Sequence, residues 1–334
     1  LYIKGISIKD ICNKLDGVFA FVLYDKNTES TFIGRDPIGI RPLFWARDNS
    51  NVIAVSSEIK GFDNLILNKK INIEVFPPNH CYSIIGSENV LEEYSDIYKS
   101  VDTSDVSLGL YKKHHNIRIR NYSKPGMMGF DMRSLTDIPQ DGTPILNSVI
   151  HSNIYELLKK AVIKRIDNSD KPVAFLCSGG IDSSIIFCIA RDYLKTKNRT
   201  LHAFSMKFND NSTSYDAFYA KLLMDQYKDD PNVKYHSVSF NWEQVLEIIE
   251  KIPKQLETYD PNTIRASIPM YLLAKHLKNT EFKVFLSGEG ADELFMGYNY
   301  FKQVPDEKEA NKESIRLLKN IHMFDVLRAD RTFN

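Results

Sequence analysis

The sequence lacks the features that mark several common classes of protein. No apolar run approaches the roughly 18–20 residues that span a membrane, and the N-terminus lacks the basic and then apolar pattern of a signal peptide. The 43 basic residues balance the 43 acidic ones, so the formal net charge is zero, and the pI is about 7.2. A protein that binds nucleic acid mainly through charge has a basic excess. We therefore expect neither a membrane-spanning segment nor a nucleic-acid partner.

Cysteine is also scarce. The four cysteines, Cys12, Cys81, Cys177 and Cys188, form no CxxC pair and are too few for a disulfide framework. This pattern predicts a protein of a reducing, cytoplasmic compartment. The chain starts with Leu1 instead of Met and ends at Asn334 without a closing signal, so we expect an internal fragment of a longer protein.

The first part of the chain predicts a mainly antiparallel β domain over residues 1–98. Hydrophobic residues make up 43% of the 334 residues, enough for about two domains with cores of their own. Short apolar or aromatic runs recur at turn spacing, as in a meander or a sandwich; they cover residues 16–24, 31–33, 42–45, 51–57 and 71–94. Residues 99–150 show no sustained period and predict a linker or insertion.

Residues 151–334 predict an α/β domain. Short apolar strands alternate with helical patterns, which is typical of a doubly wound parallel sheet that binds ligands at the carboxyl ends of its strands. The predicted strands are 173–177, 201–208, 233–240 and 283–286, and the predicted helices are 154–166, 183–194, 215–227, 243–256 and 267–277. The predicted fold class is thus α+β followed by α/β.

The strongest local motif is the run from Ser178 to Ser184, SGGIDSS, between an apolar strand and a helix. Two glycines let successive backbone N–H groups face an anion, the serines add hydroxyl donors, and the helix start adds a positive dipole end. The loop has no lysine and is not a Walker A motif. Asp182 fits a phosphate loop if a divalent cation bridges it to the phosphates. The alternative is a plain strand–turn–helix connection with Ser and Asp as helix caps.

Two further motifs lie downstream. Residues 286–295, LSGEGADELF, again follow a strand, and they place three carboxylates within five positions. Such a cluster is costly unless a cation or a reacting proton uses it; the alternative is an acidic helix start stabilised by the helix dipole. In residues 259–267, YDPNTIRAS, Arg265 could hold a carboxylate or phosphate through two hydrogen bonds, although a surface ion pair would explain it equally well.

These motifs together resemble a known family. SGGIDSS is similar to the pyrophosphate loop of the N-type ATP pyrophosphatases, and LSGEGADELFMGY and YDPNTIRASIPMYL resemble motifs of glutamine-dependent asparagine synthetase. In the β part, LDGVFAFVLYDK, GRDPIGIRPLFW and VSSEIKGF look like the second half of its N-terminal-nucleophile glutaminase domain, and MFDVLRADRT fits the later synthetase domain. The resemblance covers residues 10–95 and 150–332.

The resemblance implies an enzyme in which one domain releases ammonia from glutamine and the other adenylates aspartate, after which ammonia displaces AMP. It implies ATP and Mg²⁺ as cofactors, aspartate and glutamine or ammonia as substrates, and it leaves a homodimer open. The site residues that it implies fall into three groups. Those for ATP are Cys177, Ser178, Gly179, Gly180, Asp182, Ser183, Ser184, Met206, Ser287 and Gly288, with Asp182 and Asp292 acting through Mg²⁺. Glu289, Asp182 and Asp292 are the implied catalytic residues, and Thr263 and Arg265 the implied aspartate-binding ones.

One element of the family is missing. Its glutaminase uses an N-terminal cysteine, whereas position 1 here is Leu. None of the four cysteines carries a free α-amine, so we expect this chain itself not to hydrolyse glutamine. Two other interpretations stay open: a related amide ligase acting on another carboxylate, such as a β-lactam synthetase-like enzyme or a cell-wall or polysaccharide amidotransferase, and a catalytically inactive regulatory derivative.

Overall fold

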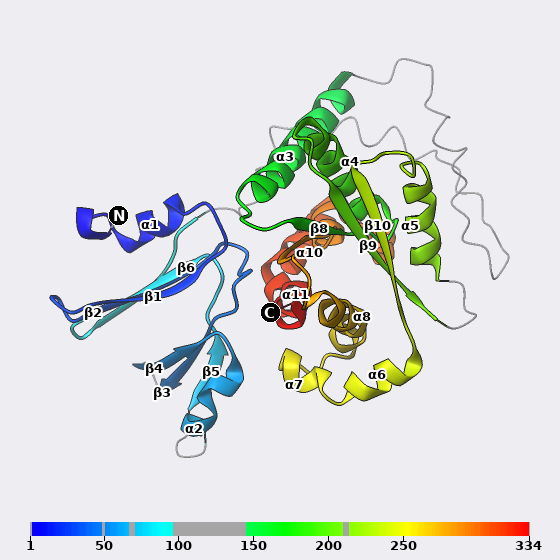
Figure 1. Ribbon diagram of the computed structural model, residues 1–334. Coiled ribbons are helices and arrows are strands. Elements are labelled where there is room, and N and C mark those ends of the chain that lie inside the picture. Colours follow the sequence, from blue (N-terminus) through cyan, green and yellow to red (C-terminus); the bar gives the residue numbers. More distant parts are fainter. Residues whose placement is uncertain (1, 49–50, 67–70, 96–144, 210–213, 334) are drawn as a thin grey trace. The chain divides into compact units, whose positions relative to one another are not determined.

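A computed structural model describes residues 2–48, 51–66, 71–95, 145–209 and 214–333 (Figure 1). The chain divides into two compact units, one of residues 1–97 with 161–334 and the other of residues 98–160. The predicted linker 99–150 lies outside the described residues up to position 144. The predicted domain boundaries therefore stay predictions.

Two antiparallel sheets form the β part. Their strand orders are β1-β2-β6-β7 and β4-β3-β5. The strands are β1 (Ala20–Asp25), β2 (Ser30–Arg35), β3 (Phe44–Asp48), β4 (Asn51–Ser56), β5 (Asn72–Val75), β6 (His80–Ile85) and β7 (Glu88–Glu93). The two sheets share one apolar cluster, in which Trp45 lies edge-on to Phe76 and Tyr82 at centroid distances of 4.9 and 5.3 Å. The prediction of an antiparallel β arrangement is confirmed.

Two short helices of this part were not predicted from the sequence. Helix α1 (Ile8–Lys14) packs Ile8, Ile11 and Cys12 against Phe32 and Cys81 of the first sheet, and α2 spans Asp63–Ile66. Helices of four to seven residues carry almost no periodic signal. Only the cap of α1, where the Ser7 hydroxyl accepts from the backbone N–H of Asp10 at 3.1 Å, marks its start.

The α/β part is built on a four-stranded parallel sheet in the order β10-β9-β8-β11. The strands are β8 (Val173–Leu176), β9 (Leu201–Phe208), β10 (Val233–Phe240) and β11 (Val284–Leu286). All of its strand pairs are parallel, with Ala174 beside His202 and Val284 beside Val173. The predicted bounds of β9 and β10 are confirmed to the residue, because these apolar-rich runs lie between clear turn residues.

Helices cover this sheet (Figure 1). Leu273 and Leu277 of α8 pack on Ala174 and Phe204, so α8 covers one face, and α4 and α5 also pack on β9. The helices are α3 (Ile145–Asp167), α4 (Ile181–Thr196), α5 (Tyr215–Asp225), α6 (Trp242–Ile249), α7 (Ile252–Leu256), α8 (Pro261–Leu277), α9 (Ala291–Phe295), α10 (Glu307–Asn320) and α11 (Asp325–Phe333). Among the described helices, none is long and apolar enough to cross a membrane.

The predicted helices have different bounds in the structure, and three differ most. The predicted helix 154–166 is α3, which begins nine residues earlier, at Ile145, inside the predicted linker 99–150. The predicted helix 243–256 is two helices, α6 and α7, because Pro253 lacks the N–H for a continuous helix and starts α7 as a first-turn residue. The predicted helix 267–277 begins six residues earlier, at Pro261, where Asp260 caps it by accepting from the Thr263 N–H at 2.7 Å. This earlier start places Thr263 and Arg265 on a helix, where the sequence predicted a loop.

Candidate functional site

The order of the parallel strands defines where a ligand can bind. The chain moves from β8 outward to β9 and β10, and then returns to the other side of β8 with β11. Strand β8 therefore lies between β9, which follows it in the chain, and β11, which the chain adds last on the other side. Such a reversal of strand order opens a crevice at the carboxyl end of the sheet. The loop after β8 is the SGGIDSS motif, and the loop after β11 is the GEGADE motif.

The first loop, residues 177–180, forms a turn that only glycine fits. Gly179 has φ +79°, and a Cβ there would lie 2.3 Å from the backbone of Tyr219 and Ala220 on α5. The Ser178 hydroxyl lies 3.1 Å from that of Ser183, which also donates to the Gly180 carbonyl at 3.2 Å. Helix α4 starts directly after Gly180, at Ile181. The loop thus brings a helix N-terminus and two hydroxyls to the crevice, a combination suited to an anion.

The second loop, residues 287–290, lies directly against the first. A Cβ at Gly288 would sit 2.8 Å from the Asp182 Cβ and 2.9 Å from the Ser183 backbone nitrogen. Gly290 has φ +91° and precedes α9. The absence of a side chain at position 288 is therefore what allows the two loops to form one site.

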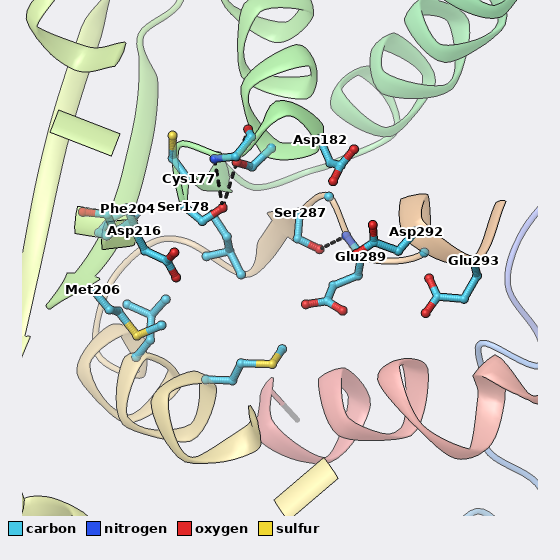
Figure 2. Close-up of a pocket in the computed structure, with 18 of the residues that line it drawn as sticks. Cys177, Ser178, Asp182, Phe204, Met206, Asp216, Ser287, Glu289, Asp292 and Glu293 are labelled. Carbon is cyan, nitrogen blue, oxygen red and sulfur yellow. Dashed lines mark hydrogen bonds between the residues drawn. The ribbon is translucent and has the colours of Figure 1, made fainter. Parts of the chain in front are cut away.

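A cavity of about 320 Å³ lies between these loops and α8 (Figure 2). Ten of the predicted site residues line it: Cys177, Ser178, Gly180, Asp182, Ser183, Met206, Ser287, Gly288, Glu289 and Asp292. Four do not: Gly179, Ser184, Thr263 and Arg265. Thr263 is buried and Arg265 is exposed on α8, the helix whose Met270 and Leu273 line the cavity.

The cavity also contains residues that sequence reasoning missed. They are Leu176, Phe204, Ser205, Asp216, Met270, Leu273, Gly290, Glu293 and Tyr298. Alternation along β9 could have indicated Phe204, two positions before Met206 on the same face. Glu293 belongs to the acidic motif and was counted there without a role. Asp216, at the start of α5, had no signal beyond its position after a strand.

Two of the carboxylates form a pair that suits a divalent cation. The pKa of Asp292 is raised by burial, by the negative charge of Asp182 and by that of Glu293. Two carboxylates that repel one another beside a loop suited to phosphate fit Mg²⁺. In proteins Mg²⁺ is bound by one or two carboxylates, and phosphate and water complete its coordination shell. Asp182 and Asp292 are the residues that would hold it. Among the described residues no group of three or more His, Cys, Asp or Glu side chains has the arrangement of a metal site of its own.

Glu289 is one of five acids that line the cavity. Its pKa is raised by burial, while the positive charge of Arg328 lowers it. Arg328 Nη2 donates to Glu289 Oε2 at 2.6 Å. The Glu289 side chain remains 40% exposed, so it is held from one side and open to a ligand on the other.

The cysteines do not form a nucleophilic site in the structure. Cys12, Cys81 and Cys177 are buried, and Cys188 is half-buried. Burial raises the pKa of the Cys177 thiol. A buried thiol with a raised pKa is a poor nucleophile at neutral pH, so Cys177 is unsuited to that role. The pKa of Cys81 is instead lowered by its hydrogen bond with Cys12, but Cys81 is buried.

The fold and the site together define an α/β domain whose pocket lies at the carboxyl end of a parallel sheet and is lined by two glycine-containing loops and several carboxylates. The asparagine synthase family model matches residues 153–329, and a glutamine amidotransferase domain model matches residues 2–64. The chain therefore belongs to the asparagine synthase family, as its motifs predicted.

Curated relatives agree with this assignment. The glutamine-hydrolysing asparagine synthetases of Bos taurus and Homo sapiens are each 35% identical over 338 residues, 99% of this chain and 54% of theirs. The chain thus spans about half the length of the relatives it matches. Among solved structures, an NH3-dependent NAD synthetase from Campylobacter jejuni overlaps 44% of this chain and 60% of its own, with 22% identity and a TM-score of 0.31.

Proposed function

We propose that the full-length protein converts aspartate to asparagine at this pocket, using ATP and ammonia, and that ammonia comes from glutamine in a preceding domain. The observation that carries the proposal is the contact of Gly288 with Asp182 and Ser183, which joins the SGG and GEG loops into one pocket with Glu289 in its wall. Membership of the asparagine synthase family supports it.

The chemistry requires the carboxylate to be activated. Oxide is a poor leaving group, so an oxygen of the aspartate β-carboxylate attacks the α-phosphate of ATP and releases pyrophosphate. In our proposal the N–H groups and hydroxyls of residues 178–184 hold the departing pyrophosphate. Bound Mg²⁺, held by Asp182 and Asp292, would neutralise its charge.

The second step forms the amide bond. Ammonia attacks the carbonyl carbon of the β-aspartyl adenylate, and AMP leaves with one of the original carboxylate oxygens. The attacking nitrogen must lose a proton, and in our proposal Glu289 accepts it. Met206 and Phe204 offer an apolar wall to the adenine, while α8, with Thr263 and Arg265 in its first turns, would help to shape the aspartate side.

The path of oxygen tests this sequence of steps. We would supply the full-length protein with aspartate carrying ¹⁸O in its β-carboxylate, together with ATP, Mg²⁺ and ammonium, and determine ¹⁸O in AMP. One labelled oxygen per AMP is the expected result. AMP without label would contradict an acyl adenylate, and label transfer from another carboxylic acid but not from aspartate would identify a related ligase instead.

A further inference from the structure

The acidic wall of the pocket contains one arginine among several carboxylates. Arg328, on α11, has a single nitrogen, Nη2, within 2.6 Å of Glu289 Oε2 and 2.7 Å of Asp325 Oδ1. An Nη nitrogen carries two hydrogens. Both hydrogens are therefore used, one on Glu289 in the pocket and one on Asp325, three residues before Arg328 on the same helix.

The charges around this arginine show what it balances. Burial raises the pKa of Asp325, and the nearby Glu293 raises it further, whereas Arg328 lowers it. Glu289 is subject to the same influences, with Asp325 and Glu293 opposing its ionisation and Arg328 favouring it. Arg328 is the cation that acts on both carboxylates.

The arginine reaches both carboxylates from a largely buried position. Its side chain is 11% exposed, yet its Nε is buried and has no hydrogen-bond partner among the described residues. Burying a charged side chain is costly unless it is paired, and the carboxylates of Asp325 and Glu289 supply that pairing. In this arrangement Nη2 lies between the carboxylates of Asp325 and Glu289.

We propose that Arg328 is a positioning residue: anchored by Asp325, it fixes the direction of the Glu289 carboxylate toward the reacting atoms in the pocket. This inference rests on the proposed function, because it assigns Arg328 to the step that uses Glu289. Without the bridge, the carboxylate turns freely between the cavity and solvent. Proton acceptance depends on geometry to within about an ångström, and a misplacement of that size costs about 100-fold in rate.

The test uses the full-length protein with Arg328→Gln and Arg328→Lys. We would measure kcat for asparagine formation with ammonium as nitrogen source, and the Kd for ATP. Arg328→Gln should lower kcat by about 100-fold and change the Kd by less than about threefold, because the phosphate loop is untouched. Arg328→Lys keeps a cationic donor and should recover at least about tenfold of the lost rate.

A matched control separates positioning from stability. Arg191 bridges Asp230 at 2.7 Å with its side chain 22% exposed, and it lies outside the residues that line the pocket. Arg191→Gln should lower the melting temperature and leave kcat unchanged. If Arg328→Gln does not fold, Asp325→Asn, which removes the negative charge of the anchor, should lower kcat by about tenfold.

The outcomes are distinct. Wild-type rates in Arg328→Gln or in Asp325→Asn would overturn the positioning role, and so would a loss of ATP affinity that parallels the loss of kcat. If the wild-type protein itself forms no AMP from aspartate and ATP, the proposed function fails, and that result is read from the wild type alone.

Discussion

Arg331 of α11 and Glu257 form a buried ion pair, with Nη2 3.1 Å from Oε2 and side chains only 4% and 8% exposed. Glu257 ends α7 in the left-handed conformation, at φ +56°, just before the segment that leads into α8. The Gln255 amide also donates to the Arg331 carbonyl at 3.0 Å. The pair therefore ties the last described helix to the end of α7, next to the segment that leads into α8, whose Met270 and Leu273 line the pocket.

Breaking this pair should be strongly destabilising. Arg331→Met removes the only cation that pairs with Glu257 among the described residues and leaves it the backbone N–H groups of Ile59 and Lys60, which costs about 3–5 kcal/mol in the free energy of unfolding. Glu257→Gln costs less, because Arg331 keeps its 2.7 Å pair with Glu58. Urea denaturation measures it. Arg316→Met, in the exposed pair with Glu313, is the control and should cost about 0.5 kcal/mol or less. Equal losses in the three variants would show that the burial of the pair has no energetic consequence.

Gly288 should tolerate no side chain. A methyl group there would meet the Asp182 Cβ at 2.8 Å and the Ser183 nitrogen at 2.9 Å, so Gly288→Ala must separate the two loops. We expect the Kd for ATP to rise by about tenfold or more, since such overpacking costs about 1–3 kcal/mol. Gly17→Ala, whose Cβ has nothing within 4 Å, is the matched control and should bind ATP normally. Unaltered binding in Gly288→Ala would mean that the loops do not act as one site.

The ionisation of Glu289 should be visible in the pH dependence of amide formation. Burial raises its pKa above that of an ordinary glutamate, and the proposed base acts as the carboxylate. The rate should therefore fall as the pH is lowered through this raised pKa, starting at a higher pH than a glutamate in water would give. The measurement is kcat against pH with total ammonium adjusted to keep free ammonia constant. Glu289→Gln should abolish most of the rate and remove the acid limb; a limb that persists in its residual activity would belong to another group.

His322 should contribute to the loss of folding stability at acid pH. This side chain is 8% exposed, and burial lowers its pKa to about 4, against about 6.5 in the unfolded chain. Between those values the unfolded chain binds a proton that the folded chain does not, so stability present above pH 6.5 is lost as the pH falls toward 4, by up to about 3 kcal/mol.

The measurement is the free energy of unfolding of wild type and His322→Asn at a series of pH values. The variant should show a shallower decline over this window. His151→Asn, at an exposed position, should decline as the wild type does. Parallel curves for wild type and His322→Asn would contradict the assignment.

Much of the fold could be predicted from the sequence because its periodic signals agree with its packing. Strands β9 and β10 lie between well-defined turn residues, and their bounds were predicted correctly. Helices α1 and α2 were missed because they are short. The start of α8 was missed because Pro261 was taken as part of a loop, although proline is well suited to the first turn of a helix.

The site was predictable where it is local and not where it depends on the fold. The two glycine-containing loops can be predicted because each follows a strand and precedes a helix in the sequence. Both loops line the cavity. Tyr298 and Met270 line the cavity because of the tertiary packing of the chain after α9 and of α8. No local sequence pattern encodes that packing. The bridge from Arg328 to Glu289 spans 39 positions in sequence, and one arginine in a helix gives no sign of such a partner.

The most direct test of the central claim is the stoichiometry of the full-length protein supplied with aspartate, ATP, Mg²⁺ and ammonium, with AMP and asparagine measured together. Equal amounts of the two products, abolished in Glu289→Ala, are the predicted result. AMP formed regardless of aspartate, or no turnover of ATP by the folded protein, would contradict it.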